Sequence, residues 1–279
     1  MSAIIECVPN FSEGKNKKTI REIKDSIAKI SGIKILDIHM DPDHNRSVIT
    51  FIGNPESVIR AAFEGTKSAA RLIDLTKHKG EHPRIGATDV IPLIPLKGIT
   101  YKKCITLAKR LGKKIGEELS IPVYLYEKAA SDSFNKNLAN IRNHPPKKPD
   151  FGPAKPGKAG ATAVGVRGIL IAFNINLKTK DILVTKEIAK RVRENSGGLK
   201  TVKALGIRLK SKGITQVSMN LTDYKITPPL KVYKTVEKLS EKFGVKIIES
   251  EIIGLVPHSA LPKTPKKTLR LKSFKEIPF

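Results

Sequence analysis

The sequence predicts an α+β protein built from two tandem ferredoxin-like βαββαβ subdomains with a cleft or tunnel between them. Three observations support this prediction. Some segments repeat apolar residues every three or four positions, as helices do, and others are short β-branched runs, as strands are. The order of these segments is the same in the two halves of the 279 residues. Turn-forming residues separate the segments and set their limits.

The first half begins with a strand, SAIIECV, and a helix in which isoleucines recur at spacings of 3, 4 and 3. Gly32 follows that helix, at a position where glycine commonly ends one. Two strand-like runs, IKILDIH and RSVITFI, come next, and DPDHN between them forms a turn. The first four elements are therefore strand, helix, strand and strand.

A second helix begins after Asn54, which acts as N-cap, with Pro55 in the first helical position. The strand VIPLIPL follows, and its two prolines predict an edge strand or a strand end. A helix from Tyr101 to Leu119 and the strand IPVYLYE complete the half. Its first six elements have the ferredoxin-like order.

The second half repeats this order. Its segments are a strand, a helix, a hairpin pair, a proline-led helix and a closing strand: RGILIAFNINL, DILVTKEIAKRVREN, VKALGIRL with TQVSMNL, PPLKVYKTVEKLSEKF and VKIIESEII. Two helices on one face of a mostly antiparallel sheet are expected in each half.

The connection HPPKKPDFGPAKPGKAGATAVG is rich in proline and glycine, so we predict a loop rather than an element. A loop this long inside a compact protein is more often functional than idle. We place it in an N-terminal subdomain of residues 1–165. A C-terminal subdomain of residues 166–279 follows and ends in a short basic tail.

The net charge is +26, and most of the excess lies in the second half. A basic chain attracts polyanions, so nucleic acid and anionic small molecules are both candidate partners. A lysine-rich surface without a specific partner is the third interpretation.

Cys7 and Cys104 are too few for a disulfide framework, which fits a reducing compartment and small core residues. No apolar run is long enough to span a membrane, and the N-terminus lacks a signal-peptide pattern. We therefore expect a cytoplasmic protein without a membrane partner.

Three segments crowd charged or imidazole groups beside strand ends: DPDHNRSV, HKGEHPRIGATDV and FGPAKPGKAGATA. Such loops on a rigid scaffold commonly carry chemistry. His78 and His82 have the i, i+4 spacing of a metal site, but Gly80 and Pro83 argue against a helix there. DPDHN could hold a cation, yet it fits a solvated turn better. We expect no metal, and the lack of a phosphate-loop motif argues against nucleotide chemistry.

The same segments carry a resemblance to a known family. ECVPNFSEGKN, DPDHNRSV, RLIDLTKHKGEHPRIGATDVIPLIPL, PDFGP, GATAVG and VSMNLTDY resemble the glutamate formimidoyltransferase (formiminotransferase) family, in the same order along the chain. The resemblance implies transfer of a formimidoyl group between N-formimidoyl-L-glutamate and N5 of tetrahydrofolate, which is the co-substrate. It also implies a homodimer. No segment resembles the cyclodeaminase to which the animal domain is fused.

The resemblance also implies the site residues. The family's catalytic histidine lies in GEHPR and maps onto His82. The animal enzymes carry an acidic residue where this chain has His39, and their folate loop is longer. That folate-contacting loop maps onto Gly152, Pro153, Ala154, Lys155, Pro156, Gly157, Lys158, Ala159 and Gly160.

The proton transfers of this reaction also favour a histidine, independently of the resemblance. The amine of glutamate must lose a proton to attack, and the departing N5 must gain one. One group that titrates near pH 7 can do both, and histidine does so without perturbation. Polar groups must hold the tetrahedral intermediate, and no covalent enzyme intermediate is required. Neither cysteine therefore needs to react.

Both ligands are anions, so arginines in the motif loops can clamp a carboxylate. The alternative is that each arginine pairs locally. Lys155 and Lys158 could attract the folate tail. The candidate substrate-binding residues are Asn10, Asp37, Asn45, Arg46 and Arg84.

Two alternative functions remain. A glutamate formyltransferase that uses 5-formyltetrahydrofolate would have the same motifs, because the sequence does not separate N=CH from O=CH at the transferred carbon. A basic nucleic-acid-binding protein would interleave aromatics with its cations, and aromatics are only 5% of this chain, with no Trp. We therefore expect no nucleic-acid partner.

Overall fold

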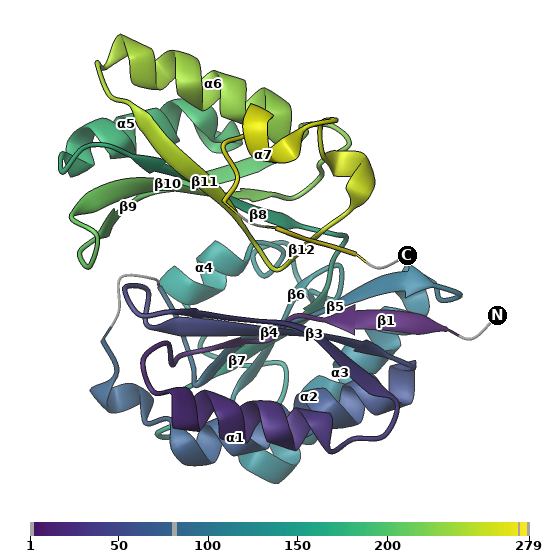
Figure 1. The fold of residues 1–279 in the computed structure, drawn as a ribbon. Helices are drawn as coiled ribbons and strands as arrows, with labels where there is room; N and C mark the ends of the chain where they lie inside the picture. Colours follow the sequence, from purple (N-terminus) through teal and green to yellow (C-terminus); the bar gives the residue numbers. More distant parts are fainter. Residues whose placement is uncertain (1–2, 80–82, 273, 278–279) are drawn as a thin grey trace. The chain divides into compact units, whose positions relative to one another are not determined.

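The computed structural model describes residues 3–79, 83–272 and 274–277 and divides the chain into two compact units. The first unit is Met1–Arg167 and the second is Gly168–Phe279. Each unit has its own sheet and its own helices, which confirms the α+β class (Figure 1).

The middle of the first unit's sheet is a strand in two pieces, β1 (Ile4–Cys7) and β2 (Asn10–Phe11). Both pieces pair antiparallel with β4 (Arg46–Gly53) on one side and with β5 (Thr88–Lys97) on the other. β3 (Ile33–Asp41) pairs antiparallel with the outer side of β4. These strands form the antiparallel part of the sheet.

Beyond β5 the sheet becomes parallel. β7 (Thr162–Val166) pairs with β5, and β6 (Val123–Glu127) pairs with β7. The connection predicted to be only a loop therefore ends in a strand. Its sequence TAVGV is short and glycine-containing, and pairing on both sides within the sheet stabilises it as a strand.

The prediction that the proline-containing strand lies at an edge is wrong, because β5 is an interior strand. The Pro92 carbonyl accepts a hydrogen bond from the Val8 N–H at the break between β1 and β2. The backbone nitrogen of Pro92, which has no N–H to donate, therefore faces this break. Pro95 lies past the end of β7, whose last residue pairs with Leu93. Each proline thus occupies a place where the ladder needs no N–H.

Three helices cover one face of this sheet: α1 (Lys17–Ala28), α2 (Pro55–Leu72) and α3 (Tyr101–Leu119) (Figure 1). The Asn54 side chain accepts the Ser57 N–H at 3.0 Å, which confirms the predicted cap. The predicted limits of the third helix are also confirmed. Ile20, Ile23 and Ile27 of the isoleucine stripe are buried in the core that α1 shares with α2 and the sheet, where apolar burial stabilises the unit.

A short helix that the sequence analysis did not predict, α4 (Leu138–Asn143), lies against the other face. Its Ile141 is fully buried in a small cluster with Val90, Tyr124 and Tyr126. The sheet is therefore packed on both faces near β5–β7–β6.

The second unit has the predicted order of strand, helix, strand, strand, helix, strand. Its four strands are antiparallel in the order β11–β8–β10–β9. Helices α5 and α6 lie on one face of the sheet (Figure 1). The elements are β8 (Ile171–Leu177), α5 (Ile182–Val192), β9 (Val202–Leu209), β10 (Ile214–Leu221), α6 (Pro229–Lys242) and β11 (Ile247–Ile253).

Short elements complete the chain. They are the 3-10 turns Leu75–Lys77, Glu194–Ser196 and His258–Ala260, the helix α7 (Pro265–Thr268), and the paired strands β12 (Leu255–Val256) and β13 (Lys275–Glu276). Cys7 and Cys104 are buried and unbridged, as predicted. Among the described residues, no helix is both long and apolar enough to cross a membrane.

Candidate active site

The loops that precede β4, β5 and β7 meet at one end of the first unit's sheet. These three strands run in the same direction, because β4 and β5 are both antiparallel to β2 and β7 is parallel to β5. Their starting ends therefore lie together. We call residues 41–46, 74–79, 83–89 and 157–161 the loop cluster. It contains parts of all three motif segments.

Two of these loops are joined backbone to backbone. The Ala87 N–H donates to the Ala159 carbonyl, and the Ala161 N–H donates to the Ile85 carbonyl, both at 2.8 Å. Gly86 and Gly160 form an antiparallel bridge between these bonds. The segment that follows His82 in sequence is thus fixed to the predicted folate loop.

The predicted folate loop is anchored at both ends and exposed in the middle. Gly152 has φ +82° and packs against the Ile121 carbonyl, where a side chain would collide. At the other end the Lys158 carbonyl accepts the Leu75 N–H at 2.8 Å. Residues 152–158 are exposed between these anchors. Because β7 follows the loop within the first unit, the loop is not a tether between the units.

Arg84 holds the DPDHN turn in place. Its Nη2 donates to the His44 carbonyl at 2.7 Å and its Nη1 to the Asn45 carbonyl at 2.8 Å. Asn45 has φ +45°, and its Nδ2 donates to the Lys79 carbonyl at 2.8 Å while its Oδ1 accepts the Gly14 N–H at 3.0 Å. Two predicted substrate-binding residues therefore tie the turn to both flanks of residues 80–82.

The turn is less solvated than its sequence suggested. His44 is only 4% exposed, and its backbone N–H donates to Asp41 Oδ1 at 2.8 Å. His78 Nε2 lies 3.1 Å from the Asn45 carbonyl and 3.0 Å from Arg84 Nη1. Burial, and next the Arg84 charge, lower the pKa of His78, which favours its neutral form near pH 7.

Asp89 and Arg142 form a buried ion pair beside this turn. The Arg142 guanidinium donates twice to Asp89 Oδ2, with the Nε bond at 3.1 Å, and Asp89 Oδ1 accepts the Ile85 N–H at 2.9 Å. The Asp89 side chain is 1% exposed and that of Arg142 13%. Asp89 is the extra residue of a β-bulge, since Phe11 pairs with Thr88 and Asn10 with Val90.

Arg46 lies close enough to the Asp89–Arg142 pair for both charges to affect its pKa. Burial and, next, the charge of Arg142 lower the pKa of Arg46 to about 10, while Asp89 and Asp41 oppose the shift. Burial also lowers the pKa of Arg84, which Asp89 opposes. With a pKa of about 10, the Arg46 guanidinium stays charged near pH 7.

Asn10 and Asp37, the other two substrate-binding candidates, lie on one face of the sheet. Asn10 pairs with Val48 and Asp37 with Thr50, so both belong to the face of the sheet opposite the three helices. Glu6, which the sequence analysis missed, pairs with Ile52 and belongs to the same face. It is 6% exposed, and burial raises its pKa to about 7 against the opposing charge of Arg167.

The predicted catalytic residue, His82, lies outside the described residues together with Gly80 and Glu81. Asp89 and Arg142 were also missed by sequence reasoning. Asp89 could have been found from the sequence, because it is a carboxylate at the start of an apolar strand. Arg142 lies in no motif.

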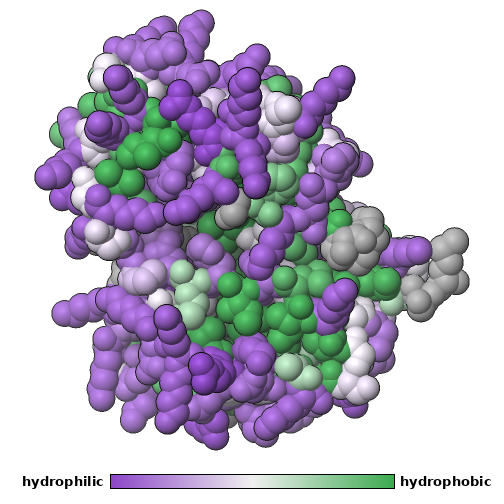
Figure 2. Space-filling model, in the orientation of Figure 1, coloured by the Kyte–Doolittle hydropathy of each residue, from purple (hydrophilic) through white to green (hydrophobic). Residues whose placement is uncertain are grey.

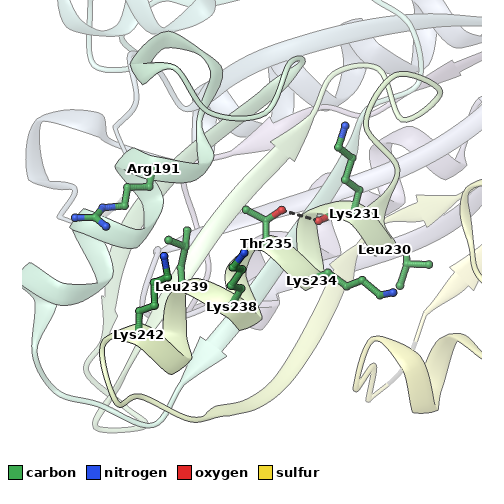
Figure 3. Close-up of a pocket in the computed structure, with 8 residues that line it drawn as sticks. All are labelled: Arg191, Leu230, Lys231, Lys234, Thr235, Lys238, Leu239 and Lys242. Atoms are coloured by element: carbon green, nitrogen blue, oxygen red, sulfur yellow. Dashed lines mark hydrogen bonds between the residues drawn. The ribbon is translucent and has the colours of Figure 1, made fainter.

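A basic groove marks the second unit. It encloses about 680 Å³ between α5 and α6, and lysines extend from one side of α6 around it (Figure 3). Hydrophilic side chains also cover most of the face shown in Figure 2, with apolar patches among them. The groove is lined by Arg191, Leu230, Lys231, Lys234, Thr235, Lys238, Leu239 and Lys242. Part of the excess charge of the second half is therefore concentrated here.

The fold and the loop cluster define an α+β protein of two units, whose first unit brings Arg46 and Arg84 together at one end of its sheet. The model of the formiminotransferase domain, N-terminal subdomain, matches residues 4–167, and that of the formiminotransferase domain matches residues 172–272. The chain belongs to the formiminotransferase family.

Individual relatives agree with this assignment. The chain is 47% identical to the glutamate formimidoyltransferase of Thermoplasma acidophilum, over 98% of this chain and 95% of that protein. It is 41% identical to the glutamate formimidoyltransferase of Streptococcus pyogenes, over 98% and 96%. It is also 41% identical to the formimidoyltransferase-cyclodeaminase of Rattus norvegicus, over 94% of this chain and 51% of that protein.

Proposed function

We propose that this protein transfers a formimidoyl group between N-formimidoyl-L-glutamate and N5 of tetrahydrofolate. Family membership over nearly the whole chain is the observation that carries this proposal. The backbone bridge between Gly86 and Gly160 supports it, because it joins the GEHPR loop to the predicted folate loop. Proximity of two substrates held by neighbouring loops supplies much of the rate in such a transfer.

His82 is the proposed general acid and base. When the amine of glutamate attacks, His82 takes a proton from that amine and returns one to the departing N5; in the opposite direction it takes the proton from N5 and returns one to the nitrogen of glutamate. The residues on both sides of it are held, Lys79 by Asn45 and Arg84 by the DPDHN turn. A base carried on a loop fixed at both ends is better oriented than one on a free loop.

Tetrahydrofolate is the proposed co-substrate, docked against residues 152–160. Glycine and proline there let backbone N–H and C=O groups approach a flat pterin closely. The anchors at Gly152 and Gly160 hold the exposed middle in one place, and Lys155 and Lys158 attract the anionic tail. A structure with a folate analogue tests this, and density remote from the loop would refute it.

Asn10, Asp37, Asn45, Arg46 and Arg84 remain the proposed substrate-binding residues. Arg84 and Asn45 act mainly by shaping the turn, given their bonds to it. Arg46 is the proposed carboxylate ligand. Asp37 and Asn10 belong to the sheet face described above.

Several finer features belong to the same proposal. Each unit is a ferredoxin-like sandwich, with β6 and β7 added to the first, and the domain boundary falls near residue 166. The protein is cytoplasmic and homodimeric, uses no metal, and has neither a nucleic-acid nor a membrane partner. These statements rest on the element order, the composition and the family resemblance.

Steady-state turnover with N-formimidoyl-L-glutamate and tetrahydrofolate tests the function. We expect glutamate and 5-formimidoyltetrahydrofolate as products. The same assay with N-formyl-L-glutamate tests the alternative, a formyltransferase. Faster turnover of the formyl substrate at equal concentration would replace our proposal with that alternative.

A further inference from the structure

A cluster of amides and carboxylates lies on the sheet of the second unit, on the face opposite α5 and α6. It consists of Asn174 and Asn176 on β8, Gln216 on β10, and Glu249 and Glu251 on β11. The residues that alternate with them on β8 and β10 pack with both helices in the core, so these side chains point away from the helices. Glu249 pairs with Asn176, and Asn176 pairs with Gln216, so polar residues cross three strands. We call these five residues the amide–carboxylate cluster.

The amide nitrogens of this cluster all donate within it. Gln216 Nε2 donates to Asn176 Oδ1 at 2.9 Å and to Glu251 Oε1 at 3.0 Å. Asn174 Nδ2 donates to the same Glu251 oxygen at 3.1 Å. Asn176 Nδ2 donates to Glu249 Oε1 at 3.1 Å. Because each nitrogen meets an acceptor, these contacts set the orientation of all three amides.

The atoms that the cluster leaves for a ligand are acceptors. Gln216 is 1% exposed, and its buried Oε1 atom has no hydrogen-bond partner among the residues that the structure describes. A buried polar atom without a partner is costly, so it indicates a donor from a ligand. The bonds to Glu251 end on its Oε1 atom, which leaves Oε2 for a further donor. Glu251 is half-buried, so the cluster is open to solvent at this side chain.

The free acceptors select the chemistry of the ligand. The two carboxylates would repel an anion, whereas they favour a group that donates N–H bonds and carries positive charge. The Gln216 amide and the Glu251 carboxylate are held side by side by their hydrogen bond. A planar N–C–N group, with N–H bonds on both nitrogens, can donate to both side chains at once. Amidinium and guanidine-like groups have this form.

Two substrate groups of the proposed reaction have this chemistry. The formimidoyl group on the nitrogen of glutamate is an amidine, and it carries N–H bonds on both nitrogens. The pterin ring of tetrahydrofolate carries an amino group at C2 beside the N3–H. An N-formyl group has only one nitrogen and cannot replace the amidine.

We infer that Gln216 and Glu251 bind an N–C–N group of a substrate, with one N–H donated to Gln216 Oε1 and another to Glu251 Oε2. This inference rests on the proposed function. Every residue that the sequence predicted for the site lies in the first unit, so the inference gives the second unit a part in substrate recognition.

Glu251→Gln tests the inference, because it exchanges one acceptor for a donor and keeps the shape of the side chain. The oxygen of the new amide can still accept the bonds from Asn174 and Gln216, so only the acceptor at Oε2 is lost. If the bound group is the pterin edge, we expect the KM for tetrahydrofolate to rise roughly 10-fold or more, with the KM for N-formimidoyl-L-glutamate little changed. If it is the formimidoyl group, the two KM values exchange these roles.

Glu241→Gln is the matched control, since Glu241 is an exposed glutamate on α6 and should leave both KM values unchanged. Gln216→Met removes the buried acceptor and should raise the same KM as Glu251→Gln. Circular dichroism shows whether each variant is folded. Unchanged KM values in folded Glu251→Gln would overturn the inference, and so would an equal rise in both.

A binding measurement separates this inference from the proposed function. The ligands are N-formimidoyl-L-glutamate and 5-formyltetrahydrofolate. The ligand that carries the bound group should raise the melting temperature of the wild type and of Glu241→Gln, and this rise should be smaller in Glu251→Gln. If turnover is absent but such a rise depends on Glu251, the proposed function fails and the N–H site stands. If turnover is present and neither rise depends on Glu251, only the inference fails.

A metal ion is the competing ligand for two carboxylates. Mg²⁺ and Ca²⁺ should therefore be tested in the same measurement, and we expect neither to change the melting temperature through Glu251. A rise with either ion that Glu251→Gln abolishes would assign the carboxylates to a cation and overturn the inference.

Discussion

Gly86 and Gly160 lie opposite each other in an antiparallel bridge, and neither position has room for a side chain. A Cβ at Gly86 would overlap the Ala161 carbonyl, and one at Gly160 would overlap the Ile85 carbonyl. Gly160 also has φ +70°, which side chains other than hydrogen disfavour. The contact between the GEHPR loop and the folate loop therefore depends on both glycines.

Gly160→Ala should separate these loops. The positive φ and the overlap with Ile85 predict a loss of roughly 1–3 kcal/mol in the free energy of unfolding, and a raised KM for tetrahydrofolate. Urea unfolding and steady-state kinetics measure the two effects. Gly157→Ala is the control for the free energy of unfolding, because a Cβ there would meet nothing within 4 Å. An equal free energy of unfolding in the two variants would contradict the proposed coupling.

His82→Ala should lower kcat by about 10²–10⁴-fold and leave the affinity for folate nearly intact, because it removes only the proton transfer. His258→Ala is a suitable control, since His258 is an exposed histidine paired with Glu276. An unchanged kcat with a raised KM would assign His82 to binding. Normal values of both parameters would exclude it from the site.

Glu6 should make the folded state sensitive to pH. Burial raises its pKa to about 7 from 4.5, so the folded state binds the proton more tightly than the unfolded state. Stability should therefore fall as pH rises from about 4.5 to about 7 and then level off, by on the order of 3 kcal/mol. In Glu6→Gln this contribution should vanish. Urea titrations of both proteins at pH 5, 6, 7 and 8 measure it, and a constant difference between them would refute the prediction.

The excess positive charge should steer anionic substrate. Salt shortens the reach of such fields to about 8 Å at 0.15 M. We therefore expect kcat/KM for polyglutamylated folate to fall more steeply with salt than for the monoglutamate, with kcat little changed. Equal salt dependence for both folates would refute steering of the tail. Binding of an oligonucleotide below micromolar at physiological salt would show a nucleic-acid partner instead.

Local features of the sequence determined most of the elements. The isoleucine stripe of α1, the Asn54–Pro55 start of α2 and the limits of α3 follow from spacing and capping, which depend on neighbours within a few residues. The element order of the second unit was readable for the same reason. The family motifs likewise predicted which loops are functional, without predicting where they lie in the fold.

Tertiary structure decided the features that depend on partners distant in sequence. Pro92 and Pro95 predict an edge strand or a strand end on their own. Only the break in the neighbouring strand and the end of β7 make an interior place possible. TAVGV became a strand because β5 and β6 offer it hydrogen bonds on both sides.

The site divides in the same way. The motifs predicted Arg46 and Arg84. The residues that shift the pKa of Arg46, namely Asp89 and Arg142, and the turn at Asn45 that Arg84 contacts, are distant from them in the sequence or lie in another loop. Arg142 is 53 residues from Asp89, and no local pattern predicts that pair. Sequence fixes which side chains are present, whereas burial and electrostatic coupling arise only when the folded chain brings distant residues together and removes water from between them.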